Sequence, residues 1–230
     1  MIFRSLWKRL ITGDGLRKTR FHTFRGNCID LAGLVHLPHC IWSSLLRVFG
    51  YRLAVPWLGY RAVKYLRQII QPEWRIIEYG SGMSSLFFAK HGKDLVSIES
   101  DRQWFDHMKT LFSKKSITNI DYRFRDVCRY TSHSDLIENS FDLCIVDGLV
   151  RDESAKQALK LVRPGGYIFM DNSDVQNSEY LTARNILLEA AIKDSVRIFN
   201  DFYPFRVGVN EGMLVQLPEI SESQYQVQSC

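Results

Sequence analysis

The feature that most constrains this chain is a glycine turn between an apolar run and a helical pattern, within the stretch RIIEYGSGMSSLFFAK (residues 75–90). Short apolar runs then alternate with helical segments. The expected strands are RIIEY, DLVSIE, DYRFR, FDLCIVD and GYIFMD, and the expected helices are SSLFFAK, RQWFDHMKTLFSKK and ESAKQALKLV. Such alternation predicts a parallel sheet with helices on both faces. The glycine turn then lies at the carboxyl edge of the sheet, where open sheets bind ligands.

The end of the chain predicts a different connection. The runs VRIFNDF and GMLVQL are joined only by YPFRVGVNE, which is too short for a crossover helix. The last strand is therefore expected to run antiparallel. Together these runs predict an α/β fold with a seven-stranded, mostly parallel sheet.

The chain is long enough for one domain, since it has 230 residues of which 46% are hydrophobic. Residues 1–52 are expected to form a basic, partly helical arm whose helical pieces in 30–49 break at Pro38. A helix with its apolar face at Val55, Leu58, Ala62, Leu66 and Ile69 precedes the first strand. The domain spans 53–220, and the polar residues 221–230 are expected to be disordered.

The net charge of +5 is concentrated in residues 1–30, which contain seven basic residues and two acidic ones. Apolar residues alternate with these charges, as Phe3, Leu6, Trp7, Leu10 and Ile11. Two interpretations remain open: peripheral contact with an anionic membrane, or a solvated basic helix packed on its own domain. Nucleic-acid binding is not expected, because the rest of the chain is neutral and has no such motif.

The five cysteines are scattered and never occur as CxxC, so neither a disulfide framework nor a zinc site is expected. The first residues also lack the pattern of a signal peptide. A cytoplasmic protein is predicted, with membrane association through the arm as the open alternative.

The residues around the turn predict its ligand. Gly80 and Gly82 permit positive φ and a close approach to a ligand, and Ser84 could cap the following helix. Glu78 ends a buried strand, where a carboxylate needs a cationic partner. Glu99 follows Gly82 by 17 residues, a distance at which an acid reaches ribose hydroxyls. Together they indicate a nucleoside with a cationic amino-acid tail.

The segments EYGSGMSS, SIES, FRDV, FDLCIVDG and LVRPGGYIFMDN resemble the motifs of class I S-adenosylmethionine-dependent methyltransferases, over residues 76–172. The late hairpin is also similar to the reversed seventh strand of that Rossmann-like fold. The resemblance implies S-adenosylmethionine as cofactor, with Glu99 at the ribose and Asp126 and Val127 at the adenine. For Asp126 an exposed acid beside three arginines is the alternative. The full implied cofactor set is Glu78, Gly80, Ser81, Gly82, Ser84, Glu99, Asp126, Val127 and Asp147.

Oxygen-bearing side chains close the fourth and fifth expected strands. Asp147 closes FDLCIVD, and Asp171 and Asn172 close GYIFMDN, a donor set that could hold Mg²⁺ or another hard cation. This is similar to metal-dependent O-methyltransferases, but those enzymes commonly place a Lys or His base where this chain has Val150. Arg151 follows, and can hold an anion but cannot accept a proton. Metal binding, metal-free contacts and a structural role stay open for this set.

The predicted function is methyl transfer to a small-molecule or glycan-type acceptor, at oxygen, with Asp147 and Arg151 as catalytic candidates. The late hairpin is expected to place Tyr203, Phe205 and Arg206 against the acceptor. Trp57 and Tyr60 could close the other side, or belong to a helix core. Two rivals remain: a non-catalytic module that docks on a membrane or protein, and a nicotinamide-dependent oxidoreductase, which Glu78 and the missing third glycine disfavour.

Overall fold

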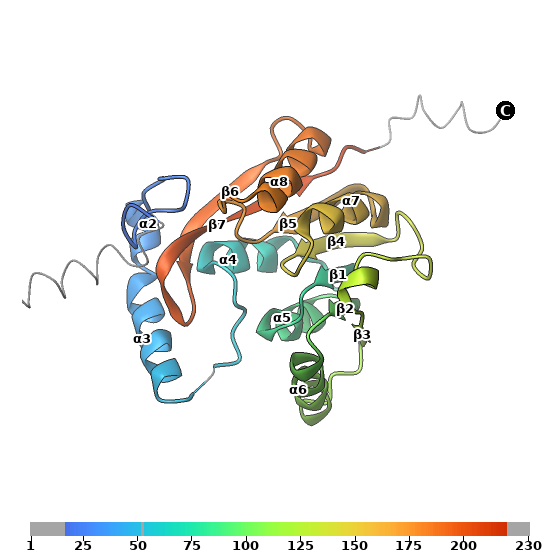
Figure 1. Cartoon of the computed structure of the whole chain (residues 1–230), viewed down its shortest axis with the longest axis horizontal. Coiled ribbons are helices and arrows are strands. Elements are labelled where there is room, and N and C mark those ends of the chain that lie inside the picture. The colour runs from blue at the N-terminus through green and yellow to red at the C-terminus, as the bar shows by residue number, and fades with distance from the viewer. Residues whose placement is uncertain (1–16, 52, 220–230) are drawn as a thin grey trace, which may run out of the picture.

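The computed structural model describes residues 17–51 and 53–219, and its centre is a seven-stranded sheet in the order β3-β2-β1-β4-β5-β7-β6 (Figure 1). β7 pairs antiparallel with both β5 and β6, whereas every other pairing is parallel. The predicted α/β fold with a reversed last strand is confirmed. The strands are β1 Arg75–Tyr79, β2 Asp94–Glu99, β3 Ile120–Phe124, β4 Phe141–Val146, β5 Val162–Met170, β6 Arg197–Tyr203 and β7 Arg206–Gln216.

Helices cover both faces of the sheet and create two apolar cores. Alternate strand residues point to opposite faces, so Ile76 packs with α4 and α5 while its neighbour Ile77 packs with α7 and α8. Because both faces are buried, the central strands are nearly continuous apolar runs. The helices of this part are α4 Tyr60–Ile69, α5 Met83–His91, α6 Arg102–Lys114, the 3₁₀ helix η1 Val127–Arg129, α7 Arg151–Leu161 and α8 Ser178–Ala190.

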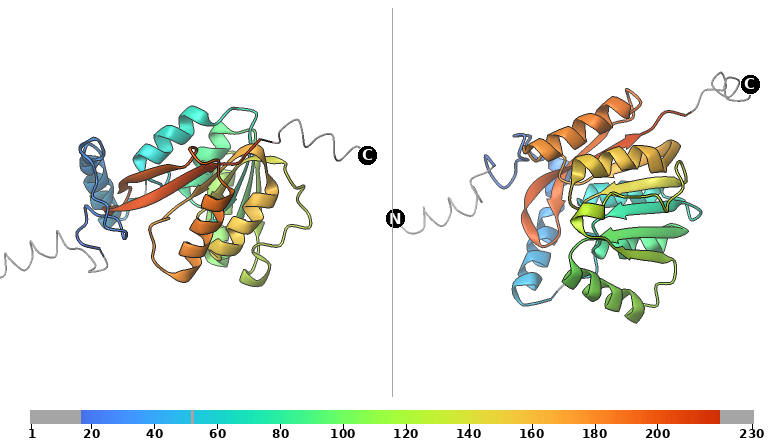
Figure 2. Two further views of the ribbon diagram at one scale, coloured as in Figure 1. Left: turned by 90° about the horizontal axis from the view of Figure 1, so that it is seen from above. Right: turned by 45° about the vertical axis from the view of Figure 1, so that its right-hand side comes forward.

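The described part of the N-terminal arm packs against the β6–β7 hairpin at one end of the sheet (Figures 1 and 2). It contains α2 Leu31–Leu34 and α3 Leu37–Val48. The Val209 N–H donates to the Arg20 carbonyl, and the Phe24 N–H donates to the Asp174 carboxylate. One side of the arm from residue 17 to residue 48 therefore packs on the domain, whereas the amphipathic pattern at residues 3–11 lies outside the described residues.

Three boundaries differ from the sequence expectations. Pro38 does not break a helix. It is the second residue of α3, and an N–H in the first turn of a helix has no partner within the helix, so its absence there costs no hydrogen bond. The helix before β1 begins only at Tyr60, so Val55 and Leu58 precede it. The expected hairpin loop YPFRVGVNE is mostly strand, because β7 starts at Arg206 and only residues 204–205 connect it to β6.

Within the described ranges, no helix combines the length and apolarity needed to cross a membrane. The expected tail at residues 221–230 lies outside those ranges.

Candidate active site

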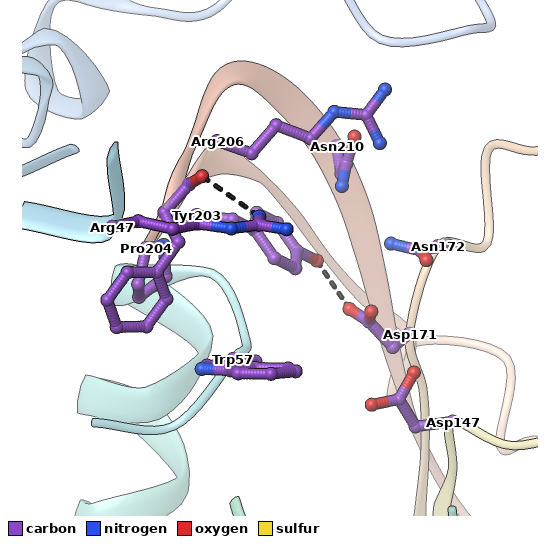
Figure 3. Close-up of a pocket in the computed structure, with 10 residues that line it drawn as sticks. Arg47, Trp57, Asp147, Asp171, Asn172, Tyr203, Pro204, Arg206 and Asn210 are labelled. Atoms are coloured by element: carbon purple, nitrogen blue, oxygen red, sulfur yellow. Dashed lines mark hydrogen bonds between the residues drawn. The ribbon is translucent and has the colours of Figure 1, made fainter. Parts of the chain in front are cut away.

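A cavity of about 270 Å³ lies at the carboxyl ends of β4 and β5, under the β6–β7 hairpin (Figure 3). The carboxylates of Asp147 and Asp171 lie side by side at its edge, and the Trp57 ring faces them from the other side. The site therefore combines residues from the strand ends, the hairpin and the arm. Its lining residues are Arg47, Trp57, Asp147, Asp171, Asn172, Tyr203, Pro204, Phe205, Arg206 and Asn210.

The glycine turn after β1 packs directly on the turn after β4. Gly80 has a φ of +91°, and a Cβ there would lie 2.8 Å from the Gly148 Cα. Gly148 has no room for a side chain either, because a Cβ would overlap the Tyr130 hydroxyl. Gly80 therefore has the expected positive φ, and its close approach to the Gly148 backbone brings the two turns together.

Gly82 and Ser84 differ from expectation. Gly82 has φ −173°, an extended conformation open to any residue, and a Cβ there would meet only the Ser84 Oγ, at 3.7 Å. Ser84 does not cap α5; the Gly82 N–H donates to the Ser85 Oγ, at 3.0 Å. Ser85 takes the capping role because it is the third residue of α5 and faces back toward the turn. The space beside Gly82 stays open.

Glu78 is fully buried at the end of β1. Its Oε1 accepts hydrogen bonds from the Ser97 hydroxyl, at 2.6 Å, and from the Ser85 hydroxyl, but its Oε2 has no partner. The pKa of Glu78 is raised to about 8, mainly by burial and to a smaller extent by the nearby carboxylates of Asp147 and Glu99. A cationic group is the partner that this carboxylate lacks. Sequence analysis missed Ser85 and Ser97, although a serine within the buried run DLVSIE was a usable signal.

Glu99 ends β2 with both carboxylate oxygens engaged. Oε1 accepts from the N–H groups of Ser100 and Asp101, at 2.7 and 2.8 Å. Oε2 accepts from the N–H and hydroxyl of Ser81, at 3.1 and 2.8 Å. The Ser81 hydroxyl also meets the Tyr122 hydroxyl, at 2.7 Å. A diol that binds Glu99 must therefore displace the Ser81 hydroxyl, which is the movable partner.

Asp147 and Asp171 form a pair of neighbouring carboxyl groups at the cavity. Burial raises the pKa of Asp171 well above its usual range, and the Asp147 charge raises it further. Burial also raises the pKa of Asp147, and its ion pair with Arg151 partly opposes that shift. The Tyr203 hydroxyl donates to Asp171 Oδ1, at 2.5 Å. The pair can therefore hold a proton at a higher pH than an ordinary aspartate does, or share a cation.

Arg151, predicted as catalytic, is buried and does not line the cavity. Its guanidinium donates to Asp147 Oδ1, at 3.0 Å, and to the carbonyls of Val146 and Asp171. It also lies over the Tyr180 ring, with Cζ 4.6 Å from the centroid. Arg151 thus joins the ends of β4 and β5 and orients Asp147 from behind.

Backbone strain is concentrated around the same cavity. Of the five described non-glycine residues with positive φ, Asn172 at +55° and Phe205 at +66° line the cavity, and Val150 at +49° follows Asp147 by three residues. This conformation is costly for a β-branched residue such as Val150. Strain of this kind collects at functional sites, where the surrounding structure enforces it.

The comparisons with known proteins agree with this geometry. The O-methyltransferase TomG from Streptomyces achromogenes, solved with SAM, has a TM-score of 0.56 at 19% identity, over 83% of this chain and 91% of its own. A Bacillus cereus O-methyltransferase with SAH has a TM-score of 0.57 at 15% identity, over 80% and 90%. The chain has the class I methyltransferase fold. A SAM-dependent O-methyltransferase from Thermotoga maritima shares the fold at 12% identity, with a TM-score of 0.52 over 71% and 67%.

No protein-family model matches the sequence, and no curated protein matches it significantly. In two weaker structural matches, to proteins from Bacillus subtilis and Pyrococcus horikoshii, this chain covers only 50% and 63% of the length of the other protein.

In this methyltransferase fold the predicted adenine residues lie apart from the cavity. Asp126 caps η1 by accepting from the Arg129 N–H, at 3.0 Å, and lines a separate surface pocket with Arg125 and Arg129. Val127 is exposed. Asp126 is exposed beside arginines, and both it and its exposed neighbour Val127 stay available to a ligand.

The hairpin residues predicted to meet an acceptor are part of the cavity wall. Tyr203, Phe205 and Arg206 all line the cavity, and the Trp57 and Phe205 rings lie 6.0 Å apart across it. Tyr60 is elsewhere, packed on His36 with a centroid distance of 5.2 Å. Sequence analysis missed Arg47 and Asn210, because their positions depend on how the arm and β7 meet.

A metal could be held only by a mixed donor set. Among residues 17–51 and 53–219, no group of three or more His, Cys, Asp or Glu side chains is arranged to bind a metal ion. The predicted set instead consists of two carboxylates and one amide, from Asp147, Asp171 and Asn172, which line one cavity. Oxygen donors of this kind suit Mg²⁺.

Proposed function

We propose that this protein is an S-adenosylmethionine-dependent methyltransferase that acts on a hydroxyl oxygen of a small-molecule or glycan-type acceptor. One observation carries the proposal: four carboxylates lie at the same sheet edge, and one of them, Glu78, has an oxygen without a partner. A cationic ligand satisfies such an edge, whereas a phosphate-bearing dinucleotide adds negative charge to it. The four are Glu78, Glu99, Asp147 and Asp171.

The cofactor, when bound, supplies a methyl group on positively charged sulfur. In the proposed arrangement the Gly80–Gly82 turn and Ser84 lie beside its methionine part, and Glu78 neutralises positive charge there. Glu99 exchanges its bonds with Ser81 for bonds to the ribose. Asp126 and Val127 border the adenine. The open space beside Gly82 supports this placement.

The acceptor hydroxyl must lose a proton during the reaction, and the aspartate pair is placed to take it. Asp171 lines the cavity, and its raised pKa makes it a better proton acceptor than an ordinary carboxylate. The Tyr203 hydroxyl fixes its orientation. Arg151 acts through Asp147 as a positioning residue, so Asp147 is the catalytic candidate of that pair.

Magnesium is part of the proposal as an assisting ion. Asp147, Asp171 and Asn172 would hold it, and it would lower the pKa of an acceptor hydroxyl. The donor set fits because two close carboxylates of raised pKa favour a shared cation. Activity that resists a chelator would leave proton transfer to Asp171 alone.

The first test is calorimetric titration of the protein with S-adenosylhomocysteine, with and without Mg²⁺, beside a nicotinamide dinucleotide control. Micromolar binding of S-adenosylhomocysteine, with no binding of the dinucleotide, supports the proposal and justifies a screen of hydroxylated acceptors. Binding of the dinucleotide instead would favour the oxidoreductase.

A second candidate is a non-catalytic module of the same fold. Val150 favours it, because no proton acceptor occupies the place where metal-dependent relatives commonly have a base. A protein of this kind should bind S-adenosylhomocysteine but transfer no methyl group to any acceptor.

Glu99→Ala should weaken binding of S-adenosylhomocysteine by roughly 1.5 to 3 kcal/mol, because charge-assisted hydrogen bonds to the ribose are lost. Ser81→Ala is the matched variant: it removes the side chain that competes for Glu99 Oε2, so affinity should not fall. Calorimetry measures both. Equal affinity of Glu99→Ala and the wild type would remove Glu99 from the site.

Gly82→Ala should keep the fold and lower cofactor affinity at least about tenfold, because the new Cβ enters the open space beside the turn. Gly80→Ala is the contrasting variant: with φ +91° and backbone at 2.8 Å, it should lower the melting temperature. Thermal melts and calorimetry separate the two effects. Unchanged affinity in Gly82→Ala would place the ligand elsewhere.

A further inference from the structure

Helix α3 presents its apolar side chains outward. Its exposed residues recur at one-, three- and four-residue steps and so form one stripe along the helix. Trp42 is 61% exposed, Val48 80% and Phe49 74%. We call this set the α3 stripe: Ile41, Trp42, Leu45, Val48 and Phe49.

The opposite face of α3 is small and polar, and it is this face that meets the domain. The Ser43 hydroxyl accepts from the Phe205 N–H, at 3.0 Å, and the Cys40 thiol donates to the Arg206 carbonyl, at 3.1 Å. Cys40 and Ser43 are buried. The usual orientation of an amphipathic helix is therefore inverted, so packing among residues 17–51 and 53–219 does not explain the apolar stripe.

The apolar surface continues beyond α3. Leu31 and Val35 are exposed before the helix, and Tyr51 is exposed after it. α2 and α3 form the end of the molecule beyond the β6–β7 hairpin (Figures 1 and 2). Contiguous exposed apolar patches of this kind on soluble proteins mark contact surfaces.

The charge of the sequence segment that carries the stripe indicates the kind of surface that it contacts. Residues 31–72 contain five Lys or Arg and no Asp or Glu, although the chain has 25 acidic residues. Residues 1–72 together hold twelve basic residues and two acidic ones. An apolar stripe with aromatic residues, set in a basic, acid-free segment, suits an anionic lipid surface, where the aromatic side chains enter the headgroup region.

We propose that the α3 stripe seats this protein on the surface of an anionic lipid bilayer. The proposal is independent of the methyl-transfer chemistry. It narrows the expected contact through the basic N-terminal arm, residues 1–52, to a defined helix face. Arg47 belongs to the same helix, lines the cavity and donates to the Phe205 carbonyl, at 3.3 Å. When α3 is bound to the bilayer surface, the mouth of the cavity therefore lies close to the lipid headgroups.

The test is flotation of the full-length protein with phosphatidylcholine vesicles that contain or lack phosphatidylglycerol. The wild type should bind the anionic vesicles, and high salt should weaken binding because the charges are screened. The double variant Trp42→Gln, Phe49→Gln should lose at least about tenfold in partition coefficient, because two aromatic side chains no longer leave water. Its melting temperature should match that of the wild type, since both side chains are exposed.

The matched control is Leu188→Gln, Ile192→Gln, which changes two exposed apolar side chains at the end of α8, 37% and 40% exposed. This control should bind vesicles like the wild type. Equal binding by the α3 double variant would overturn the proposal. A second outcome would also overturn it. If the wild type does not bind vesicles but forms a dimer in light scattering, and the double variant is a monomer, the stripe is a subunit interface.

Discussion

Asp171→Asn is expected to lower kcat for methyl transfer at least about a thousandfold, while affinity for S-adenosylhomocysteine changes less than about twofold. Asp171 lines the cavity at the end of β5, whereas the residues proposed to hold the methionine part and the ribose lie at the turn after β1, in α5 and at the end of β2. An asparagine keeps the volume but can neither accept a proton nor neutralise a cation. Single-turnover kinetics with labelled cofactor, together with calorimetry, measure the two quantities separately.

Tyr203→Phe is the companion variant, because it leaves both carboxylates in place and removes only the hydrogen bond to Asp171 Oδ1. That bond stabilises the ionised carboxylate and so lowers the pKa of Asp171. Its removal should move the acidic limb of the pH–rate profile to higher pH. A fully active Asp171→Asn would show that this carboxyl group is structural.

The sheet was predictable because its determinants are local. β1 and β2 coincide with the expected runs RIIEY and DLVSIE, since a buried parallel strand flanked by turns leaves a continuous apolar run. The reversed last strand was also predictable, because so short a connection as that between β6 and β7 permits only a hairpin. The carboxylates of the site followed from these strands, as each lies at or just after a strand end.

The parts that failed depend on contacts between distant segments. Nothing near Arg47 in the sequence indicates that α3 reaches the cavity, since that depends on its packing against Phe205 in the hairpin. The length of β7 was underestimated because Gly208 and Asn210 in the segment RVGVNE are typical of loops, yet Val209 packs on the arm in a separate apolar cluster. The arm and the hairpin stabilise each other, so the structure of neither could be predicted from its own sequence alone.

Pro38 shows how position changes the meaning of a residue. A proline within a helical pattern predicts a break, but at the second residue of a helix its fixed φ favours the first turn. The pattern alone did not show that α3 begins at Leu37 and not earlier. The outward stripe on α3 was equally hidden, because periodicity identifies an apolar face without showing what covers it.

Glu78→Gln is expected to stabilise the protein without ligand at pH 8 and to weaken its cofactor binding. Burial raises the pKa of Glu78 to about 8, whereas an unfolded glutamate titrates near 4.5. Between these values the folded state binds more protons than the unfolded state, so this residue's contribution to stability is lost as pH rises from about 4.5 to 8. The total loss is roughly 3 to 5 kcal/mol.

A glutamine at position 78 keeps an oxygen that accepts from Ser85 and Ser97 and has no charge to bury. The difference in unfolding free energy between the variant and the wild type should therefore be small at pH 5 and grow in favour of the variant toward pH 8.5. Urea denaturation at a series of pH values measures it, with Glu189→Gln, an exposed change on α8, as the control that shows no such trend.

The same substitution removes the carboxylate proposed to meet the cationic part of the cofactor, so affinity for S-adenosylhomocysteine should fall at least about tenfold at pH 8. Higher stability with weaker binding is the expected result where a buried, unpaired charge is retained for a ligand. A variant that is less stable than the wild type at pH 8 and binds equally well would show that Glu78 is a structural carboxylate whose partner lies within the protein.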